Sequence, residues 1–317
     1  MSEPLITPRA AGAGEQFLAT LAGLTISLRP HQWVKNLLVF SGLIFSGSLL
    51  RGELLARSLL AFLLFCLASS GIYLLNDLRD LAADRLHPQK RLRPLATGQI
   101  SVPMALLVMA FLLILAITGA WLLHSAFFIL LVLYLLMNAG YSFGLKHVLI
   151  LDILIVAMGF VIRAAAGAVV ISVEPSPWLI LCTLTLALMI VSAKRRDDLD
   201  QKRTLVARDW YTPRFLDLMT MIMGGAAIIT YALYTQAPET AARLGSRDML
   251  LTVPFVIYGI LRYIFLTLRR ESASDPAWVF MTDPPMIINA FCWLAVACFV
   301  LYKPLNWIIW RAEINGP

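Results

Sequence analysis

Three aspartates at helical spacing carry the clearest chemical signal in this sequence. Asp77, Asp80 and Asp84 are separated by three and four residues, a spacing that predicts one face of an α-helix. Carboxylates gathered in this way repel one another unless a cation lies between them. Mg²⁺ prefers oxygen ligands and typically bridges one or two carboxylates to the phosphates of a substrate. The spacing therefore predicts a magnesium site, and a solvated helix end with incidental charges is the alternative.

A run of basic residues follows these acids. Lys90, Arg91 and Arg93 come shortly after Pro88, a residue type that ends helices. Lysine and arginine form charge-assisted hydrogen bonds to phosphate oxygens. Acids for a metal beside bases for phosphate predict a diphosphate site and make the solvated helix end the weaker alternative.

A second charged segment begins at Lys194 with the residues KRRDDLD. Its two leading cations, Lys194 and Arg195, are suited to phosphate, and its acids are Asp197, Asp198 and Asp200. This segment could face the first acidic cluster across a helical bundle. A basic loop that only sets membrane orientation would give a similar composition.

Single polar residues at the ends of apolar segments, or within them, complete the candidate set. Lys35 lies in RPHQWVKN, and Tyr141 and Lys146 lie in YSFGLKH. Arg163 lies within an apolar segment, on the same helical stripe as Asp152. An arginine facing lipid is costly, so Arg163 should face the protein interior. Anchoring at the membrane interface or structural pairing remains an alternative to substrate binding for each of them.

The elements that position these residues are predicted to be membrane-spanning helices. Sixty per cent of the 317 residues are hydrophobic and 14% are charged, whereas soluble proteins carry about 25% charged residues. A membrane-spanning helix needs roughly 20 mostly apolar residues. The predicted fold is all-α, a polytopic membrane bundle of about nine helices. The expected spans are 36–50 (short), 56–76, 102–121, 125–143, 150–170, 177–195, 216–236, 249–268 and 286–303.

The charge distribution predicts how these spans are oriented. With a cytoplasmic N-terminus, eighteen of the 26 lysines and arginines fall in cytoplasmic segments or at the cytoplasmic ends of spans. The positive-inside rule requires such an excess. We therefore expect loops 76–101 and 194–215 in the cytoplasm and the C-terminus outside. Residues 1–28 form an N-terminal segment with a candidate interfacial helix, 29–305 the intramembrane domain and 306–317 a tail. The sequence has no basic patch interleaved with aromatic residues, so it does not predict a nucleic-acid partner.

The motifs resemble those of a known superfamily. NDLRDLAADR resembles the NDxxDxxxD signature of the UbiA-type intramembrane prenyltransferases. Within that superfamily, RPHQWVKN, YSFGLKH, IRAAAG and KRRDDL are similar to motifs of the decaprenyl-phosphate phosphoribosyltransferases. The similarity extends from about residue 25 to 305, which is nearly the whole chain.

The resemblance implies an activity, a site and a location. The reaction would transfer 5-phosphoribose from 5-phosphoribosyl 1-diphosphate (PRPP) to a polyprenyl phosphate, releasing diphosphate, at the cytoplasmic face of the inner membrane. Asp77, Asp80 and Asp84 would hold catalytic Mg²⁺. The acceptor phosphate is already ionised at neutral pH, so no general base is needed. The residues assigned to substrate binding are Lys35, Asn76, Lys90, Arg93, Tyr141, Lys146, Arg163, Lys194, Arg195 and Tyr211.

One departure from the superfamily pattern separates the alternatives. Its aromatic prenyltransferases carry a second acidic motif where this chain has KRRDDLD, with cations leading. The alternative enzyme is an aromatic prenyltransferase with a polyprenyl diphosphate donor. A lipid or ion transporter is less favoured, because the charge lies at one membrane face without a clear repeat. Prenyl chain length and homo-oligomerisation stay open.

Overall fold

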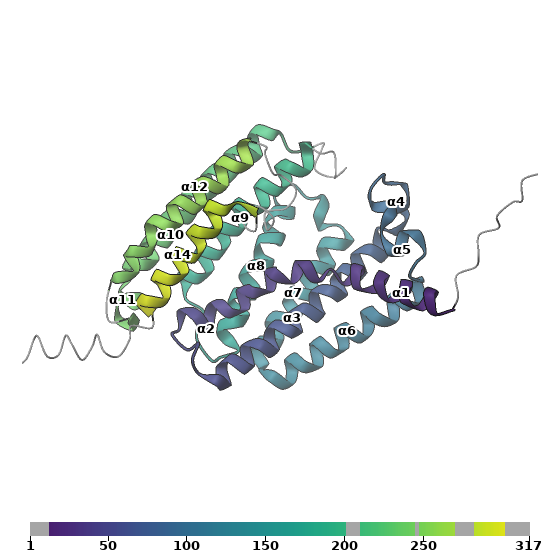
Figure 1. Cartoon of the computed structure of the whole chain (residues 1–317), viewed down its shortest axis with the longest axis horizontal. Helices are drawn as coiled ribbons and strands as arrows, with labels where there is room; N and C mark the ends of the chain where they lie inside the picture. Colours follow the sequence, from purple (N-terminus) through teal and green to yellow (C-terminus); the bar gives the residue numbers. More distant parts are fainter. Residues whose placement is uncertain (1–12, 201–209, 245–246, 270–281, 302–317) are drawn as a thin grey trace, which may run out of the picture. The chain divides into compact units, whose positions relative to one another are not determined.

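The computed structural model in Figure 1 describes residues 13–200, 210–244, 247–269 and 282–301, and all of its regular elements there are helices. Within these ranges, eight helices are long and apolar enough to cross a membrane. The predicted all-α polytopic membrane fold is confirmed. The eight are α3 (Gly52–Arg79), α6 (Val102–Leu123), α7 (Ser125–Phe143), α8 (Leu151–Val169), α9 (Pro177–Asp200), α10 (Pro213–Gln236), α12 (Val253–Arg269, with the 3₁₀ helix η4, Asp248–Thr252, before it) and α14 (Pro284–Leu301).

The N-terminal part differs from the short first span expected at 36–50. Helix α1 (Ala13–Leu28) is followed by the 3₁₀ helix η1 (Pro30–Phe40) and the short α2 (Ser41–Phe45). The break falls at Arg29, whose φ is +53°. Pro30 explains it, because proline lacks an N–H and disfavours helical geometry in the residue before it. Residues 36–50, expected as a short span, comprise the end of η1, the helix α2 and the turn that follows it.

Three expected regions lie partly or wholly outside the described residues. They are the beginning of the N-terminal segment, the middle of the loop 194–215 and the C-terminal tail. The helix expected in the N-terminal segment is present as α1, with Phe17, Leu18 and Leu21 exposed on it.

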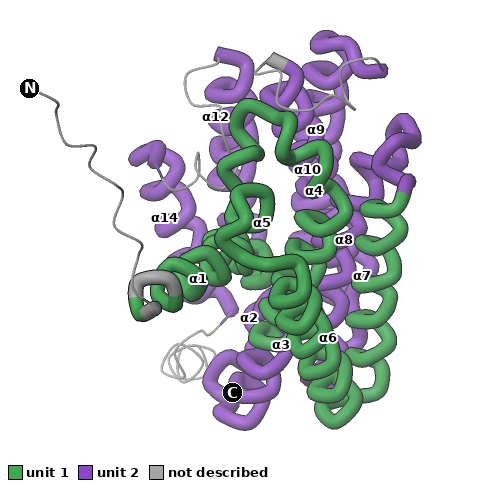
Figure 2. The backbone as a smooth tube through the Cα atoms, turned by 90° about the vertical axis from the view of Figure 1, so that its right-hand side faces the viewer, with its two compact units in different colours: residues 1–37, 62–143 green, residues 38–61, 144–317 purple. Residues whose placement is uncertain are grey.

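The chain divides into two compact units, coloured separately in Figure 2. Unit 1 comprises residues 1–37 and 62–143. Its core joins α3, α6 and the short α5 (Pro94–Thr97) through Leu74, Leu95, Ile100 and Leu112. This packing fixes both ends of the charged stretch that contains α4 (Leu81–Leu86) and the 3₁₀ helix η2 (Lys90–Leu92).

Unit 2 comprises residues 38–61 and 144–317. Helix α8 is its most buried membrane span, and small residues occupy much of its buried surface, including the run Ala164–Ala168. Small side chains allow membrane helices to approach one another closely. Two further clusters hold α9 against α8 and α10, and against α12 and α14.

Gly167 of α8 lies directly against the backbone of Val39 in unit 2. A Cβ atom added there would lie 1.9 Å from the carbonyl oxygen of Val39. Gly167→Ala should lower the melting temperature in detergent, because overpacking that moves backbone costs about 1–3 kcal/mol. Gly225→Ala in α10 is the matched control, since its Cβ would meet nothing within 4 Å. Equal melting temperatures for the two variants would contradict this close contact.

Candidate functional site

The acidic motif lies at a junction between two helices. Helix α3 ends at Arg79 and α4 begins at Leu81, with Asp80 between them. Backbone hydrogen bonds continue across the junction, from Asp80 N–H to the Asn76 carbonyl (2.9 Å) and from Asp84 N–H to the Asp80 carbonyl (2.8 Å). The expectation of one helix face is thus corrected to a junction of two helices. Asp77 and Asp84 are each 3% exposed, and Asp80 is half-buried.

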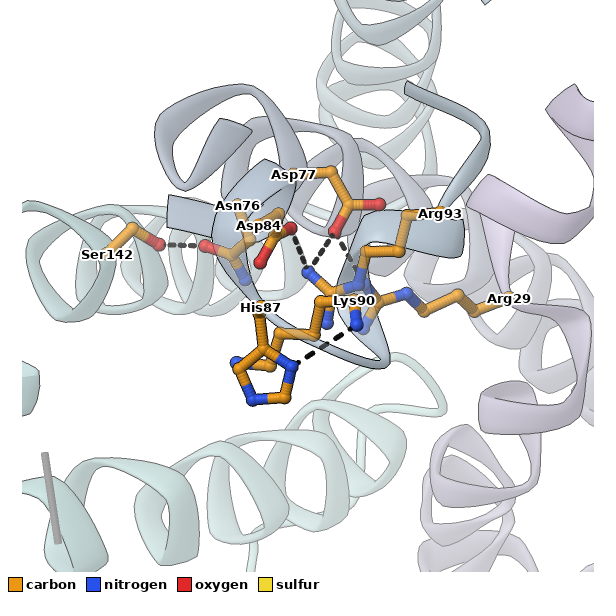
Figure 3. A network of polar contacts seen from close by, with 8 residues as sticks. All are labelled: Arg29, Asn76, Asp77, Asp84, His87, Lys90, Arg93 and Ser142. Atoms are coloured by element: carbon orange, nitrogen blue, oxygen red, sulfur yellow. Dashed lines mark hydrogen bonds and ion pairs between the residues drawn. The ribbon is translucent and has the colours of Figure 1, made fainter. Parts of the chain in front are cut away.

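Two arginines neutralise the buried acids, as Figure 3 shows. Arg93 Nη1 lies 3.1 Å from Asp77 Oδ1 and 2.6 Å from Asp84 Oδ2. Arg29 Nη2 lies 2.6 Å from Asp77 Oδ1. Burying a carboxylate is costly unless it is paired and hydrogen-bonded. The two acids and two guanidinium groups therefore form one charge-balanced cluster.

Local structure explains how the two arginines reach the acids. Arg93 precedes Pro94, which favours an extended backbone at Arg93, and its φ and ψ are −63° and 142°. Arg29 precedes η1, which contacts α3 through Ser70. The Ser70 hydroxyl accepts from Trp33 Nε1 (3.1 Å) and donates to the Leu28 carbonyl (2.9 Å). The guanidinium group of Arg29 also lies over the Tyr73 ring, 4.9 Å from its centroid.

Among the remaining unit 1 candidates, Asn76 and Lys90 lie in the same stretch of chain as the two acids, whereas Tyr141 and Lys35 lie in α7 and η1. The Ser142 hydroxyl, from α7, donates to the side-chain oxygen of Asn76. The backbone N–H of Lys90 donates to His87 Nδ1 at 3.3 Å. Lys90 and Tyr141 are half-buried, as is Lys35 in η1.

The arrangement of Asp77 and Asp84 fits a bound Mg²⁺. Among the described residues, no three or more His, Cys, Asp or Glu side chains already form a metal-binding group. Two buried carboxylates nevertheless converge on one cationic nitrogen of Arg93. The position between the two carboxylates favours a cation. The carboxylate oxygens around it are the kind of ligand that Mg²⁺ prefers. Asp77 and Asp84 would hold the ion, with Asp80 beside them at the junction.

A second charged cluster lies in unit 2 around Asp152, in the first turn of α8. The Tyr211 hydroxyl donates to Asp152 Oδ1 at 2.6 Å, and Arg195 Nε lies 3.0 Å from Asp152 Oδ2. The Tyr211 hydroxyl also accepts from the Ile150 N–H at 2.7 Å. Burial, and next the hydrogen bond to Asp152, raises the pKa of Tyr211 above its usual value. Tyr211 therefore stays a protonated donor at neutral pH.

The other charged residues of unit 2 have different surroundings. Arg163 is buried, as expected, and its Nη1 donates to the Gly159 carbonyl at 2.7 Å. Arg262 forms a two-point ion pair with Asp283, at 3.0 and 2.8 Å. That hydrogen-bonded partner lowers the pKa of Asp283. Lys146 and Lys194 are half-buried.

Reasoning from the sequence missed Arg29 as a partner of Asp77 and Asp152 as a partner of Arg195. Arg29 had one signal, its place at the start of RPHQWVKN. Asp152 had another, because an acid in an apolar segment is expected to be paired. The expected approach of the second charged segment to the first stays a prediction.

Comparison with known proteins agrees with this fold and these motifs. The UbiA prenyltransferase family profile matches residues 36–293. Decaprenyl-phosphate phosphoribosyltransferase from Mycobacterium tuberculosis (strain H37Rv) is 34% identical over 304 residues, covering 93% of this chain and 97% of the relative. Its namesake from Mycolicibacterium smegmatis is 32% identical, covering 89% and 93%. These relatives confirm the resemblance inferred from the motifs.

A solved structure supports the same fold. The UbiA homolog from Archaeoglobus fulgidus bound to DMAPP and Mg²⁺ superimposes with a TM-score of 0.67 at 20% identity, covering 87% of this chain and 97% of that one. The structural likeness, the family profile and the near full-length relatives agree. This chain therefore belongs to the UbiA prenyltransferase family.

Proposed function

We propose that this protein transfers 5-phosphoribose from PRPP to a polyprenyl phosphate in a Mg²⁺-dependent reaction that releases diphosphate. The observation that carries the proposal is the cluster of two buried acids and two arginines at the end of α3. The names of the relatives, which align with nearly the whole chain, support the choice of substrates.

The unit 1 cluster is suited to a diphosphate leaving group. Asp77, Asp84 and Asp80 would hold Mg²⁺. The ion would neutralise the charge that develops on the leaving diphosphate. Arg93 and Arg29 would exchange carboxylate oxygens for phosphate oxygens, because guanidinium groups bind both in the same forked geometry. Lys90, in the same loop, would add a further cation.

The unit 2 cations would bind a substrate phosphate. Lys194 and Arg195 lie in the last two turns of α9, directly before the acids of KRRDDLD. Tyr211 would act by fixing the surroundings of Arg195 through Asp152. The other proposed substrate contacts are Lys35, Asn76, Tyr141, Lys146 and Arg163.

We also propose that the protein lies in the inner membrane with its site facing the cytoplasm, because the basic loops predict that orientation. Single cysteines at the exposed positions Arg91 and Glu239 test it, in a variant whose four native cysteines are replaced by alanine. In intact cells, an impermeant maleimide should label Glu239→Cys, and it should label Arg91→Cys only after permeabilisation. Labelling of both positions in intact cells, or the reverse pattern, would contradict the proposed orientation.

One assay tests the proposed reaction. Purified protein in detergent is given radiolabelled PRPP and a polyprenyl phosphate, with Mg²⁺ or with a chelator. Label should move to the lipid fraction only with Mg²⁺. A parallel reaction supplies a polyprenyl diphosphate and a phenolic acid, the substrates of the alternative enzyme. Product in that reaction, without transfer from PRPP, would overturn the proposal.

A further inference from the structure

We infer that Asp152 is a positioning residue that orients Arg195 for a phosphate group of PRPP, an inference that rests on the proposed function. Asp152 is 3% exposed, and the side chain of Arg195 is 13% exposed. Burying two such charges is costly, so a paired and oriented arginine here needs an explanation beyond solubility or membrane orientation.

Both carboxylate oxygens of Asp152 are used within unit 2. Oδ1 accepts the hydrogen bond from Tyr211, and Oδ2 contacts Arg195 Nε. These contacts join the first turn of α8, the end of α9 and the residue two positions before α10. A carboxylate engaged at both oxygens is suited to holding its partners rather than to binding a metal.

The contact through Nε matters for what Arg195 can do. A guanidinium group is planar and carries its five N–H donors in a fixed fork. The ion pair with Asp152 lies on the Nε side of this group. It therefore restricts the direction of the edge that carries both Nη atoms, and a two-point phosphate contact uses that geometry. An arginine oriented in advance loses less conformational freedom when the phosphate binds. Asp152 would thus favour PRPP binding without touching PRPP.

A strained backbone at the same place supports a built site. Ile150 has φ +68°, in a region that β-branched residues rarely adopt. Strain of this kind persists where surrounding contacts hold it, and it is common at functional sites. Here Tyr211 accepts the Ile150 N–H at 2.7 Å while it donates to Asp152. One hydroxyl therefore links the strained turn to the carboxylate that holds Arg195.

The neighbouring pair offers a matched control. Arg196 Nε lies 3.1 Å from Asp217 Oδ1, again between α9 and α10, but the side chain of Asp217 is 29% exposed. Asp152→Asn and Asp217→Asn therefore remove the same charge from adjacent ion pairs. We expect Asp152→Asn to raise the KM for PRPP about ten- to hundred-fold, the effect expected when the charge-assisted contact of Arg195 with phosphate is lost. The KM for polyprenyl phosphate should change less than about three-fold, and Asp217→Asn should change neither beyond that.

A double-mutant cycle identifies the route of the effect. If Asp152 acts through Arg195, Asp152→Asn should add little to the KM for PRPP once Arg195→Ala is present. Full additivity, an equal rise in both KM values, or an equal effect of Asp217→Asn would overturn the inference. Should Asp152→Asn fail to fold, Tyr211→Phe decides, with a rise of roughly two- to ten-fold in the KM for PRPP expected and no rise counting against the inference.

The proposed function can fail separately from this inference. Isothermal titration of the wild-type protein with PRPP and Mg²⁺ comes first. No binding and no turnover would refute the phosphoribosyl reaction itself. Normal wild-type turnover, with an unchanged KM for PRPP in Asp152→Asn, would refute only the role of Asp152.

Discussion

Asp77→Asn and Asp84→Asn should each abolish transfer while the protein still folds and inserts into the membrane. Each change removes a negative charge from a buried carboxylate and keeps nearly the same shape. The lost electrostatic contribution at such a site typically lowers kcat by about 10²–10³-fold. The readout is transfer of labelled phosphoribose at saturating Mg²⁺, with the melting temperature in detergent measured alongside.

Glu53→Gln is the matched control for these changes. Glu53 lies in the first turn of the same helix, α3, where it pairs with Arg57 on the surface. Its activity should stay at the wild-type level. A titration of PRPP at increasing Mg²⁺ adds a measurement that does not depend on turnover, and both aspartate variants should bind PRPP–Mg²⁺ more weakly. Near-normal turnover in both would rule out the proposed metal ligands.

Lys194→Ala or Arg195→Ala should raise the KM for PRPP, lower kcat, or both. Loss of a charge-assisted phosphate contact costs roughly 1.5–3 kcal/mol, which is about ten- to hundred-fold in kcat/KM. Asp197→Ala should reduce activity less than a change at Asp77 or Asp84, because only the first motif is assigned the essential metal. Kinetics of these variants, with binding of PRPP–Mg²⁺ to the wild-type protein, check this order.

The same variants separate the two candidate enzymes. An aromatic prenyltransferase would need the acids in the last turns of α9 as much as the acids at the end of α3, and PRPP would not bind. Arg196→Ala is the control for a general loss of positive charge, because Arg196 is adjacent in α9 and paired with Asp217. It should retain activity within about three-fold of the wild-type value, as expected for a partly exposed pair. A loss equal to that of Arg195→Ala would argue against a specific phosphate contact.

The sequence alone determined the type of fold, the acidic motif and the family. Membrane spans are predictable because hydrocarbon imposes a requirement on each segment by itself, about 20 apolar residues with few charges. Eight such helices are present in the part of the chain that is described. The short apolar stretch 36–50 was less predictable, because Pro30 and the packing of η1 and α2 decide its form.

The tertiary structure alone decided which charges meet. Arg29 and Asp77 are 48 residues apart, and Asp152 and Tyr211 are 59 apart. The cost of an arginine facing lipid correctly predicted that Arg163 is buried. Asp152, on the same stripe, is held by Arg195 and Tyr211 from other elements. Charge pairing depends on the rotation and register of neighbouring helices. Close packing between helices, as at Gly167 and Val39, sets this rotation and register. No single segment of the sequence encodes that packing.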